Sequence, residues 1–245
     1  MSWIAVLLVG LGMADLVQSV KPVRIVPECV GAAVAVLTGL WAGLIETPDV
    51  VALIVIAAVV VLWGQTVTAA FAGRRPAALP LAVAGVALAA GLLVSGSAGP
   101  VAGPFAAWVE GVPFPALDGL GPERALLLLG VLLVQLSTGN VVVRLVLMVT
   151  KTVNPARHGG EGDPETQLKG GRLLGPMERV VIVGLGVAGQ LTAASIVIAA
   201  KGLLRFPELS SDREQVRIHR LTEYFLVGSF VSWLLALSLL VLLAP

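Results

Sequence analysis

The stretch that decides the fold of this chain covers residues 175–206 and reads GPMERVVIVGLGVAGQLTAASIVIAAKGLLRF. It is apolar for most of its length, and five polar side chains interrupt or end it: Glu178, Arg179, Gln190, Lys201 and Arg205. It also contains GLGVAG at residues 184–189. This run matches the G-x-G-x-x-G pattern that binds dinucleotides when it joins a strand to a helix. The interpretation of these glycines separates a soluble nucleotide-binding enzyme from a membrane protein.

The sequence around the glycines favours the membrane protein. A dinucleotide-binding fold needs several alternating strands and helices after the motif. Here one further hydrophobic element follows, at about residues 221–244, and it is long enough to cross a bilayer. Glycines three and four residues apart are also common in transmembrane helices, where they let neighbouring helices approach closely. We therefore interpret the motif as a helix-packing face and expect no nucleotide or other cofactor.

The composition points the same way. Of the 245 residues, 57% are hydrophobic and 13% are charged, whereas about 25% are charged in a typical soluble protein. The apolar residues occur in runs of about twenty, the length of a transmembrane helix. A net charge of +1 leaves no broad basic surface for nucleic acid. A single cysteine, Cys29, and two isolated histidines, His158 and His219, predict neither a disulfide nor a metal site.

These runs predict an all-α, polytopic transmembrane bundle of six or seven spans. We expect three regions: four helices within residues 1–94, an extracytoplasmic interfacial loop at 95–121, and a C-terminal transmembrane region at 122–245. The loop is rich in glycine and proline and carries the aromatic residues Phe105, Trp108 and Phe114. The expected spans cover about residues 3–20, 26–45, 50–72, 76–94, 123–150, the central stretch and 221–244.

Basic residues predict the orientation. They gather at residues 21–24, 74–75 and 144–172, and none occurs at 46–49 or 95–121. An extracytoplasmic N-terminus satisfies all these positions under the positive-inside rule. The basic connector at 201–220 conflicts with it if the central stretch crosses once. Either the stretch crosses against the rule, giving seven spans, or it dips in and returns near residues 184–189, giving six. We favour the crossing, because residues 191–204 continue as a helix without a proline.

Polar residues in the fifth expected span form the first candidate site. On a continuous helix, Ser137, Asn140, Arg144 and Lys151 fall within a sector of roughly 60°. Charges are costly inside a bilayer and usually face a partner or a water-filled cavity. This sector therefore predicts either a seam that attracts an anionic group from the cytoplasm or a hydrogen-bonded helix contact with Arg144 reaching outward.

The central stretch and three acids complete the candidates. Gln190, Lys201 and Arg205 share a similarly narrow sector, which suits a phospholipid phosphate or an interfacial anchor. Glu178 and Glu223 lie near expected helix N-termini, and pairings of Glu178 with Arg179 or of Glu223 with Arg144 are conceivable. Asp15 is the most isolated acid in a span. It could carry protons or pair with a buried base, although its position near the helix end also permits simple hydration.

The C-terminal part contains four runs that form a recognisable pattern: LKGGRLLGPMER (168–179), GQ (189–190), AAKGLLRF (199–206) and TEYFLVGSFVSWLLAL (222–237), with TGNVVVR (138–144) as an extension. These runs resemble an uncharacterised bacterial membrane family, domain of unknown function 3307, which includes the membrane component of a streptococcal acid-tolerance operon. The family pattern consists of G-R-L-I-G…E-R, a mid-helix Q, A-K-S…R-F and E-Y…I-G-T…S.

The resemblance implies a bacterial inner-membrane protein without an established activity, with Glu178, Gln190, Lys201, Arg205 and Glu223 as residues of interest. The N-terminal half departs from the family, because ADLVQ (14–18) lacks the histidine and the D-F-x-x-Q ending found there. Any proton-linked or metal role of that half is therefore not implied here.

Three functions remain open at this point. The first is a small transporter-like or channel-like bundle whose residues Asn140, Arg144, Gln190 and Lys201 handle an anionic solute or lipid head group. The second is a membrane enzyme acting on a lipid-linked phosphate, held by Arg144, Lys201 and Arg205, with Glu178 or Asp15 as the base. The third is a structural or regulatory subunit with a protein partner or a second copy of itself. Anionic membrane lipids are the expected small partners.

Overall fold

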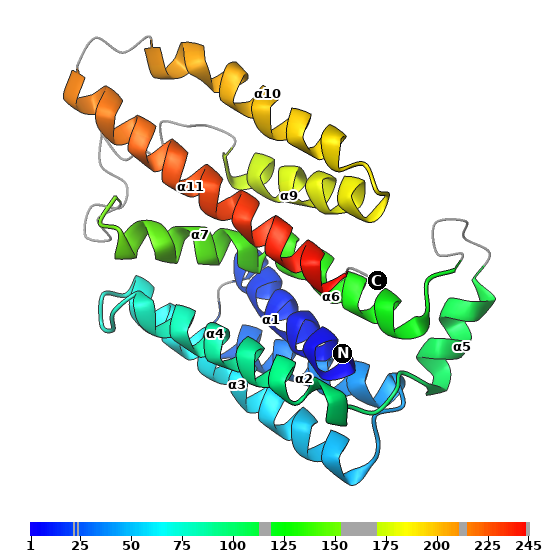
Figure 1. Ribbon diagram of the computed structural model, residues 1–245. Helices are drawn as coiled ribbons and strands as arrows, with labels where there is room; N and C mark the ends of the chain where they lie inside the picture. The colour runs from blue at the N-terminus through cyan, green and yellow to red at the C-terminus, as the bar shows by residue number, and fades with distance from the viewer. Residues whose placement is uncertain (22, 24, 113–118, 153–170, 211–214, 244–245) are drawn as a thin grey trace. The chain divides into compact units, whose positions relative to one another are not determined.

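The computed structural model of the chain describes residues 1–21, 23, 25–112, 119–152, 171–210 and 215–243, with the side chains of 171–172, 201–210 and 215–221 left out. All regular secondary structure in these residues is helical, which confirms the all-α class (Figure 1). The helices are α1 (Ser2–Val20), α2 (Val26–Trp41), α3 (Thr47–Phe71), α4 (Ala78–Leu93), the 3₁₀ turn η1 (Ser95–Ser97), α5 (Gly103–Gly111), α6 (Pro122–Leu136), α7 (Thr138–Val149), α9 (Gly171–Val187), α10 (Leu191–Ser210) and α11 (Gln215–Leu242).

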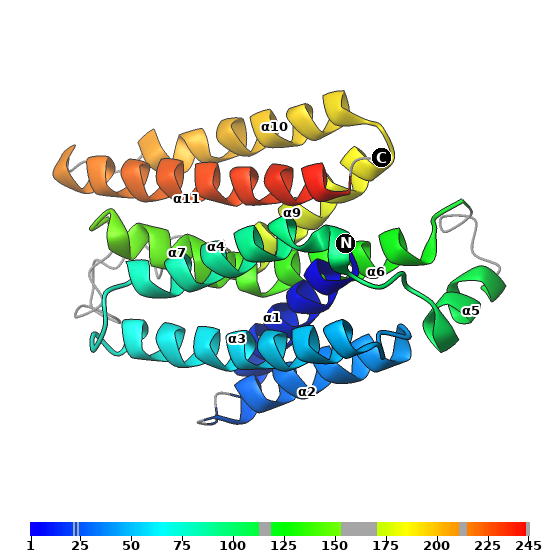
Figure 2. The same ribbon diagram turned by 60° about the horizontal axis from the view of Figure 1, so that its bottom comes forward.

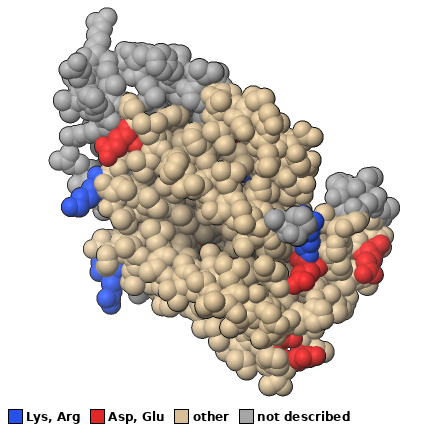
Figure 3. Space-filling model, viewed as in Figure 1, with Lys and Arg blue, Asp and Glu red and all other residues tan. Residues whose placement is uncertain are grey.

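Several of these helices have the length and hydropathy of membrane spans. Among the described residues, α1, α3 and Thr222–Leu242 of α11 each satisfy both requirements alone, and α6 with α7 satisfies them as a bent pair. The helices α2 and α4 are apolar but shorter. Large apolar side chains such as Leu37, Ile54 and Val241 are exposed, and uncharged side chains cover most of the described face in Figure 3. An apolar exterior of this kind is what a lipid environment selects.

The helices group into two compact units. The first consists of Met1–Ala69 with Leu79–Thr138, and the second of Ala70–Ala78 with Gly139–Pro245. The fifth expected span is therefore divided between them: α6 belongs to the first unit, because it packs closely on α1. A Cβ atom added to Gly12 of α1 would lie 2.7 Å from Leu133 Cβ, and one added to Gly130 would lie 2.8 Å from the Ala5 carbonyl oxygen.

In the first unit, α1 is the central helix, and most of its residues from Ser2 to Asp15 are buried. Its other close neighbours are α2 and α3. A Cβ at Gly10 would lie 2.8 Å from Val60 and 2.9 Å from Ala35, and a Cβ at Gly31 would lie 2.6 Å from Ala14. Glycine at these crossings lets the helix backbones approach more closely than any other residue would allow.

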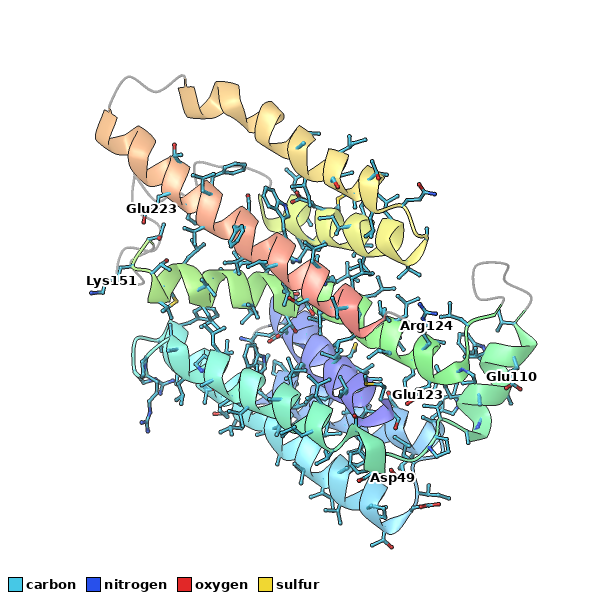
Figure 4. The ribbon with its side chains drawn as sticks, viewed as in Figure 1. Asp49, Glu110, Glu123, Arg124, Lys151 and Glu223 are labelled. Carbon is cyan, nitrogen blue, oxygen red and sulfur yellow. The ribbon has the colours of Figure 1, made fainter. Side chains whose placement is uncertain are left out.

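Polar contacts gather the connectors at one end of the first unit. Asp49, at the start of α3, accepts hydrogen bonds from Trp3 Nε1 at 2.7 Å and from the Gly99 amide at 3.1 Å. The amino terminus of Met1 forms an ion pair of 2.6 Å with Glu123, and Figure 4 shows Asp49 and Glu123 near this end. The connectors at residues 46–49 and 95–121, which the sequence predicts on one side of the membrane, therefore contact each other.

The segment expected as an interfacial loop contains a short helix, α5. Phe105 of α5 is buried and its ring lies 5.3 Å from that of Trp41, measured between centroids. The Trp108 ring lies 6.1 Å from both rings and is about half exposed. The aromatic side chains thus anchor α5 to the end of α2. The described segment has no helix of spanning length, in agreement with its prolines.

The fifth expected span is not one continuous helix. It bends by 49° between α6 and α7, at Ser137. The Ser137 hydroxyl donates to the carbonyl oxygens of Leu133 on its own helix, at 2.8 Å, and of Gly12 on α1, at 2.6 Å. Serine bonded back to its own helix bends helices, and the following Gly139 offers little resistance. The predicted 60° sector assumed a straight helix, and the bend removes Ser137 from it, whereas Asn140 and Arg144 still lie one turn apart on α7.

The central stretch is also interrupted, so it is not the single continuous helix expected from the sequence. Gly189 has a φ of +75°, the Gly189 amide donates to the Gly186 carbonyl, and the Gln190 amide donates to the Leu185 carbonyl. This is the Schellman arrangement, with glycine at the left-handed position that ends a helix. The chain then reverses, and α9 and α10 lie side by side in both Figure 1 and Figure 2.

The glycines of the motif thus end a helix. The described residues contain no strand, so the context of a dinucleotide-binding motif is missing. The packing role that we expected holds for Gly186, where an added Cβ would collide with Leu240 of α11. At Gly184 and Gly189 an added Cβ would meet open space.

Helix directions in the second unit follow from its contacts. Arg179 of α9 bonds to Ser232 of α11, and further along both helices Gly186 meets Leu240, so α9 and α11 run parallel. The start of α7 also contacts Arg179, whereas Thr152, just after α7, bonds to Glu223 near the start of α11. Therefore α7 runs antiparallel to α11. Figure 4 shows Lys151 and Glu223 at this shared end.

Candidate functional site

Arg179 is the centre of a polar cluster in the second unit. Its residue is 1% exposed, which makes it one of the largest fully buried side chains among the described residues. Its Nη1 donates to Ser232 Oγ of α11 at 3.0 Å, and its Nη2 donates to Asn140 Oδ1 of α7 at 2.9 Å. One guanidinium therefore joins three helices. We call Arg179, Asn140 and Ser232 the arginine cluster.

Two glycines make room for this guanidinium. A Cβ at Gly139 would lie 2.6 Å from Arg179 Nε and 2.7 Å from its Cζ, and a Cβ at Gly175 would lie 3.4 Å from Nη1. Gly139 directly precedes Asn140, so the sequence TGN supplies both the space and an acceptor. Gly175 lies one turn before Arg179 on α9, where it leaves the same face of the helix open.

The neighbouring acid, Glu178, is also held by α11. Its Oε1 accepts a hydrogen bond of 2.9 Å from Trp233 Nε1, so consecutive residues of α9 bond to consecutive residues of α11. The Glu178 carboxylate lies one residue from the buried guanidinium, and the expected Glu178–Arg179 pairing stays a prediction. The cluster as a whole presents a buried guanidinium hydrogen-bonded to Asn140 and Ser232, and the guanidinium is a group that binds anions.

The other candidates of the second unit have different surroundings. Arg144 and Asn140 both lie on α7. The Arg144 guanidinium lies 5.0 Å above the Phe71 ring, a cation–π contact, whereas Asn140 accepts a hydrogen bond from Arg179. Glu223 is exposed and accepts a bond of 3.5 Å from Thr152, in place of the conceivable pairing with Arg144. Gln190 is exposed in the turn before α10. Lys201 and Arg205 lie on α10, and their side chains are outside the described part of the structure. The segment that contains His158 is also outside the described residues.

Asp15 lies in the first unit and is buried, at 6% exposure, so simple hydration at the helix end is wrong. Trp63 Nε1 of α3 donates to its two carboxyl oxygens at 3.2 and 3.1 Å. Its partner is thus an indole and not a base. In the described residues no group of three or more metal-binding side chains occurs.

Sequence reasoning missed the central role of Arg179 and the participation of Ser232 and Trp63. The signal for Arg179 was an arginine inside an apolar run, which is costly and calls for partners. We had weighted the helical sector around Arg144 instead. Ser232 carried no signal by itself, because isolated serines are common in transmembrane helices.

No model of a protein family, no curated protein and no solved structure matches the chain.

Proposed function

We propose that this chain is a small transporter-like or channel-like membrane protein that handles an anionic solute or an anionic lipid head group through the arginine cluster. The burial of Arg179 between Asn140 and Ser232 is the observation that carries this proposal. A charge inside an apolar helix bundle costs several kcal/mol, and ionisable residues in that position usually serve function. The planar guanidinium is the side chain best suited to phosphate and carboxylate groups.

The acceptors of the cluster suit a site that opens and closes. Asn140 and Ser232 are neutral, so they satisfy the guanidinium without neutralising its charge. An arriving anion could replace either acceptor and gain a charge-assisted hydrogen bond, which is about twice as strong as a neutral one. The displaced amide or hydroxyl could then donate to the same anion, because both side chains carry donor groups.

We further propose a bacterial inner-membrane location with an extracytoplasmic N-terminus, as the family resemblance and the positive-inside rule suggest. The reversal at Gly189 supports this orientation. Because α10 returns antiparallel to α9, the C-terminal end of α10, which includes Lys201 and Arg205, lies on the same side as the N-terminal end of α9. This arrangement would remove the conflict with the positive-inside rule and favours six spans plus one helical hairpin.

Cysteine labelling tests this orientation. In a Cys29→Ala background, single cysteines at Thr152 and Ser210 should react with a membrane-impermeant maleimide only from the cytoplasmic side, whereas one at Glu46 should react only from outside. Inverted vesicles and intact cells provide the two directions.

Each position has the same reagent and the same background, so Glu46→Cys serves as the matched control for the other two. Labelling of Ser210→Cys from outside, with Thr152→Cys labelled from inside, would mean that residues 175–206 cross the membrane once and would overturn the hairpin orientation.

Native mass spectrometry of the detergent-purified protein tests the anion site. We expect a discrete co-purifying anionic mass on the wild type, and at least about a tenfold lower occupancy on Arg179→Gln, because a buried charge contact is worth about 2–5 kcal/mol. Arg75→Gln is the matched control, since Arg75 is exposed and the change is chemically identical. It should keep the wild-type occupancy.

Arg144→Ala and Lys201→Ala extend this measurement to the wider seam predicted from the sequence. If the cluster is the site, both should retain the mass better than Arg179→Gln does. A bound mass that survives in Arg179→Gln, or a wild type without any bound anion, would contradict the proposed site. The mass itself distinguishes a lipid from a free solute.

A further inference from the structure

Two acidic side chains are buried together in the first unit, away from the arginine cluster in sequence and in unit. Asp15 of α1 is 6% exposed and Glu28 of α2 is 5% exposed. The crossing of α1 and α2 brings them together, because a Cβ added to Gly31, one turn after Glu28, would lie 2.6 Å from the Cβ of Ala14, which directly precedes Asp15. We call Asp15 and Glu28 the acid pair.

Three consecutive residues of α3 hold the acid pair. Trp63 Nε1 donates to Asp15, and Gln65 Nε2 donates to Glu28 Oε1 at 3.2 Å. Between them, Gly64 leaves the space that the Glu28 side chain occupies, since an added Cβ there would collide with Glu28 Cγ. Both acids are therefore fixed in place by one turn of helix, and neither side chain can turn to solvent without losing these contacts.

Two further oxygen atoms at this place lack a hydrogen-bond partner. They are Glu28 Oε2 and Thr138 Oγ1, both in residues more than nine-tenths buried. The Thr138 hydroxyl lies close to the Asp15 carboxyl but forms no hydrogen bond with it. Buried oxygens without partners are rare, because each costs about 1–3 kcal/mol. Carboxyl and hydroxyl oxygens of this kind are the ligands that small cations prefer.

A ligand held by these oxygen atoms would have to carry a positive charge. In the described part of the chain, Asp15 and Glu28 have no ion pair with a basic residue. Two ionised carboxylates that repel each other in an apolar interior would be very costly. One added positive charge removes the repulsion and can satisfy Glu28 Oε2 at the same time.

We propose that the acid pair binds one small monovalent cation, either a proton shared by the two carboxyl groups or a sodium ion, with Thr138 Oγ1 as a neutral oxygen ligand. The two possibilities share one chemistry, since in both the oxygen atoms of the acid pair hold one positive charge and the pair keeps one negative charge. The site is independent of the proposed anion site, which lies in the other unit. The side chains that face the acid pair from other elements are Trp63, Gln65 and Thr138, none of which titrates, so any pH effect here belongs to the acid pair.

Thermal unfolding of the full-length protein in detergent tests the proposal. At constant ionic strength, about 150 mM NaCl replaces choline chloride, in buffers between about pH 5 and pH 9. A sodium site should raise the Tm by about 3 °C or more in sodium relative to choline. A shared proton should give no sodium effect, but a Tm that falls as the pH rises, because deprotonation leaves two like charges buried in the folded protein.

Asp15→Asn and Glu28→Gln should each abolish whichever dependence the wild type shows, since the neutral amide removes the repulsion. Glu46→Gln, at an exposed acid, is the matched control and should keep it. Trp63 offers a second measurement if a variant fails to fold. Wild-type tryptophan emission should change with the same ion or pH, and Trp63→Phe should lose that change. Independence of the wild-type Tm and emission from both sodium and pH, or a dependence unaltered in Asp15→Asn and Glu28→Gln, would overturn the proposal.

Discussion

An Arg179→Ala variant should have a free energy of unfolding lower than the wild type by about 3–5 kcal/mol. The substitution removes the donor that satisfies Asn140 Oδ1 and Ser232 Oγ, and it leaves a cavity among α7, α9 and α11. Unfolding by sodium dodecyl sulfate in mixed micelles, followed by the loss of far-ultraviolet ellipticity, measures this difference. Arg75→Ala, at an exposed arginine, should remain within about 0.5 kcal/mol of the wild type.

A second variant separates stability from function at the same place. Replacing a buried ionic cluster by apolar residues of similar volume is often neutral or stabilising by about 1–4 kcal/mol. The triple variant Arg179→Met, Asn140→Leu, Ser232→Ala should therefore recover most of the stability lost in Arg179→Ala. It should still lose the anionic mass. A triple variant that folds well and retains the anion would show that the cluster is not the binding group.

Recovered stability in the triple variant would link the cluster to function. If an apolar core at this position is as stable as the polar one, folding alone gives no reason for an arginine there. The free energy cost of burying Arg179 then has to be offset by what the charge does. A triple variant that remains as unstable as Arg179→Ala would instead assign the cluster to helix assembly, as in a structural subunit.

Much of the fold could be predicted from the sequence, because it depends on local composition. Apolar runs near the length of a bilayer gave the helices, and the acidic and basic connectors marked their ends. The helix stop at Gly189 was also available locally. A glycine placed directly after a helical segment is the ordinary signal for a C-terminal cap. The match of GLGVAG to a nucleotide-binding motif concerns a different property of the same glycines and obscures this signal.

The candidate site could be predicted less well, because it depends on contacts between distant segments. The sector of Ser137, Asn140 and Arg144 assumed a straight helix, and the bend at Ser137 comes from a bond to Gly12, 125 residues away. Likewise, Asp15 meets Trp63 across 48 residues. Periodicity within one helix identifies which side chains share a face, but it contains no information on which other helix covers that face. Asn140 belongs to that sector, but its partner Arg179 lies on a different helix, which the sector does not indicate.

The crossing of α1 and α2 should be the most sensitive packing contact of the first unit, and Gly31→Ala tests it. The added methyl group would lie 2.6 Å from both Ala14 Cβ and the Gly10 carbonyl oxygen, and 2.9 Å from the Ala14 amide nitrogen. Backbone atoms cannot turn aside, so the helices must separate. We expect a loss of about 1–3 kcal/mol in the free energy of unfolding, measured as for Arg179. Gly85→Ala makes the same chemical change where an added Cβ meets open space, and should raise stability by up to about 1 kcal/mol.

The same substitution connects packing to the proposed cation site. Ala14 directly precedes Asp15, and Gly31 lies one turn after Glu28, so a methyl group at Gly31 separates the two helices that carry the acid pair. Gly31→Ala should therefore weaken the sodium or pH dependence of the Tm as well as lower the Tm itself, whereas Gly85→Ala should leave the dependence unchanged. A Gly31→Ala protein with reduced stability and a full ion response would mean that cation binding does not require the close approach of α1 and α2. An undiminished stability would mean that the two helices are not in contact at Gly31.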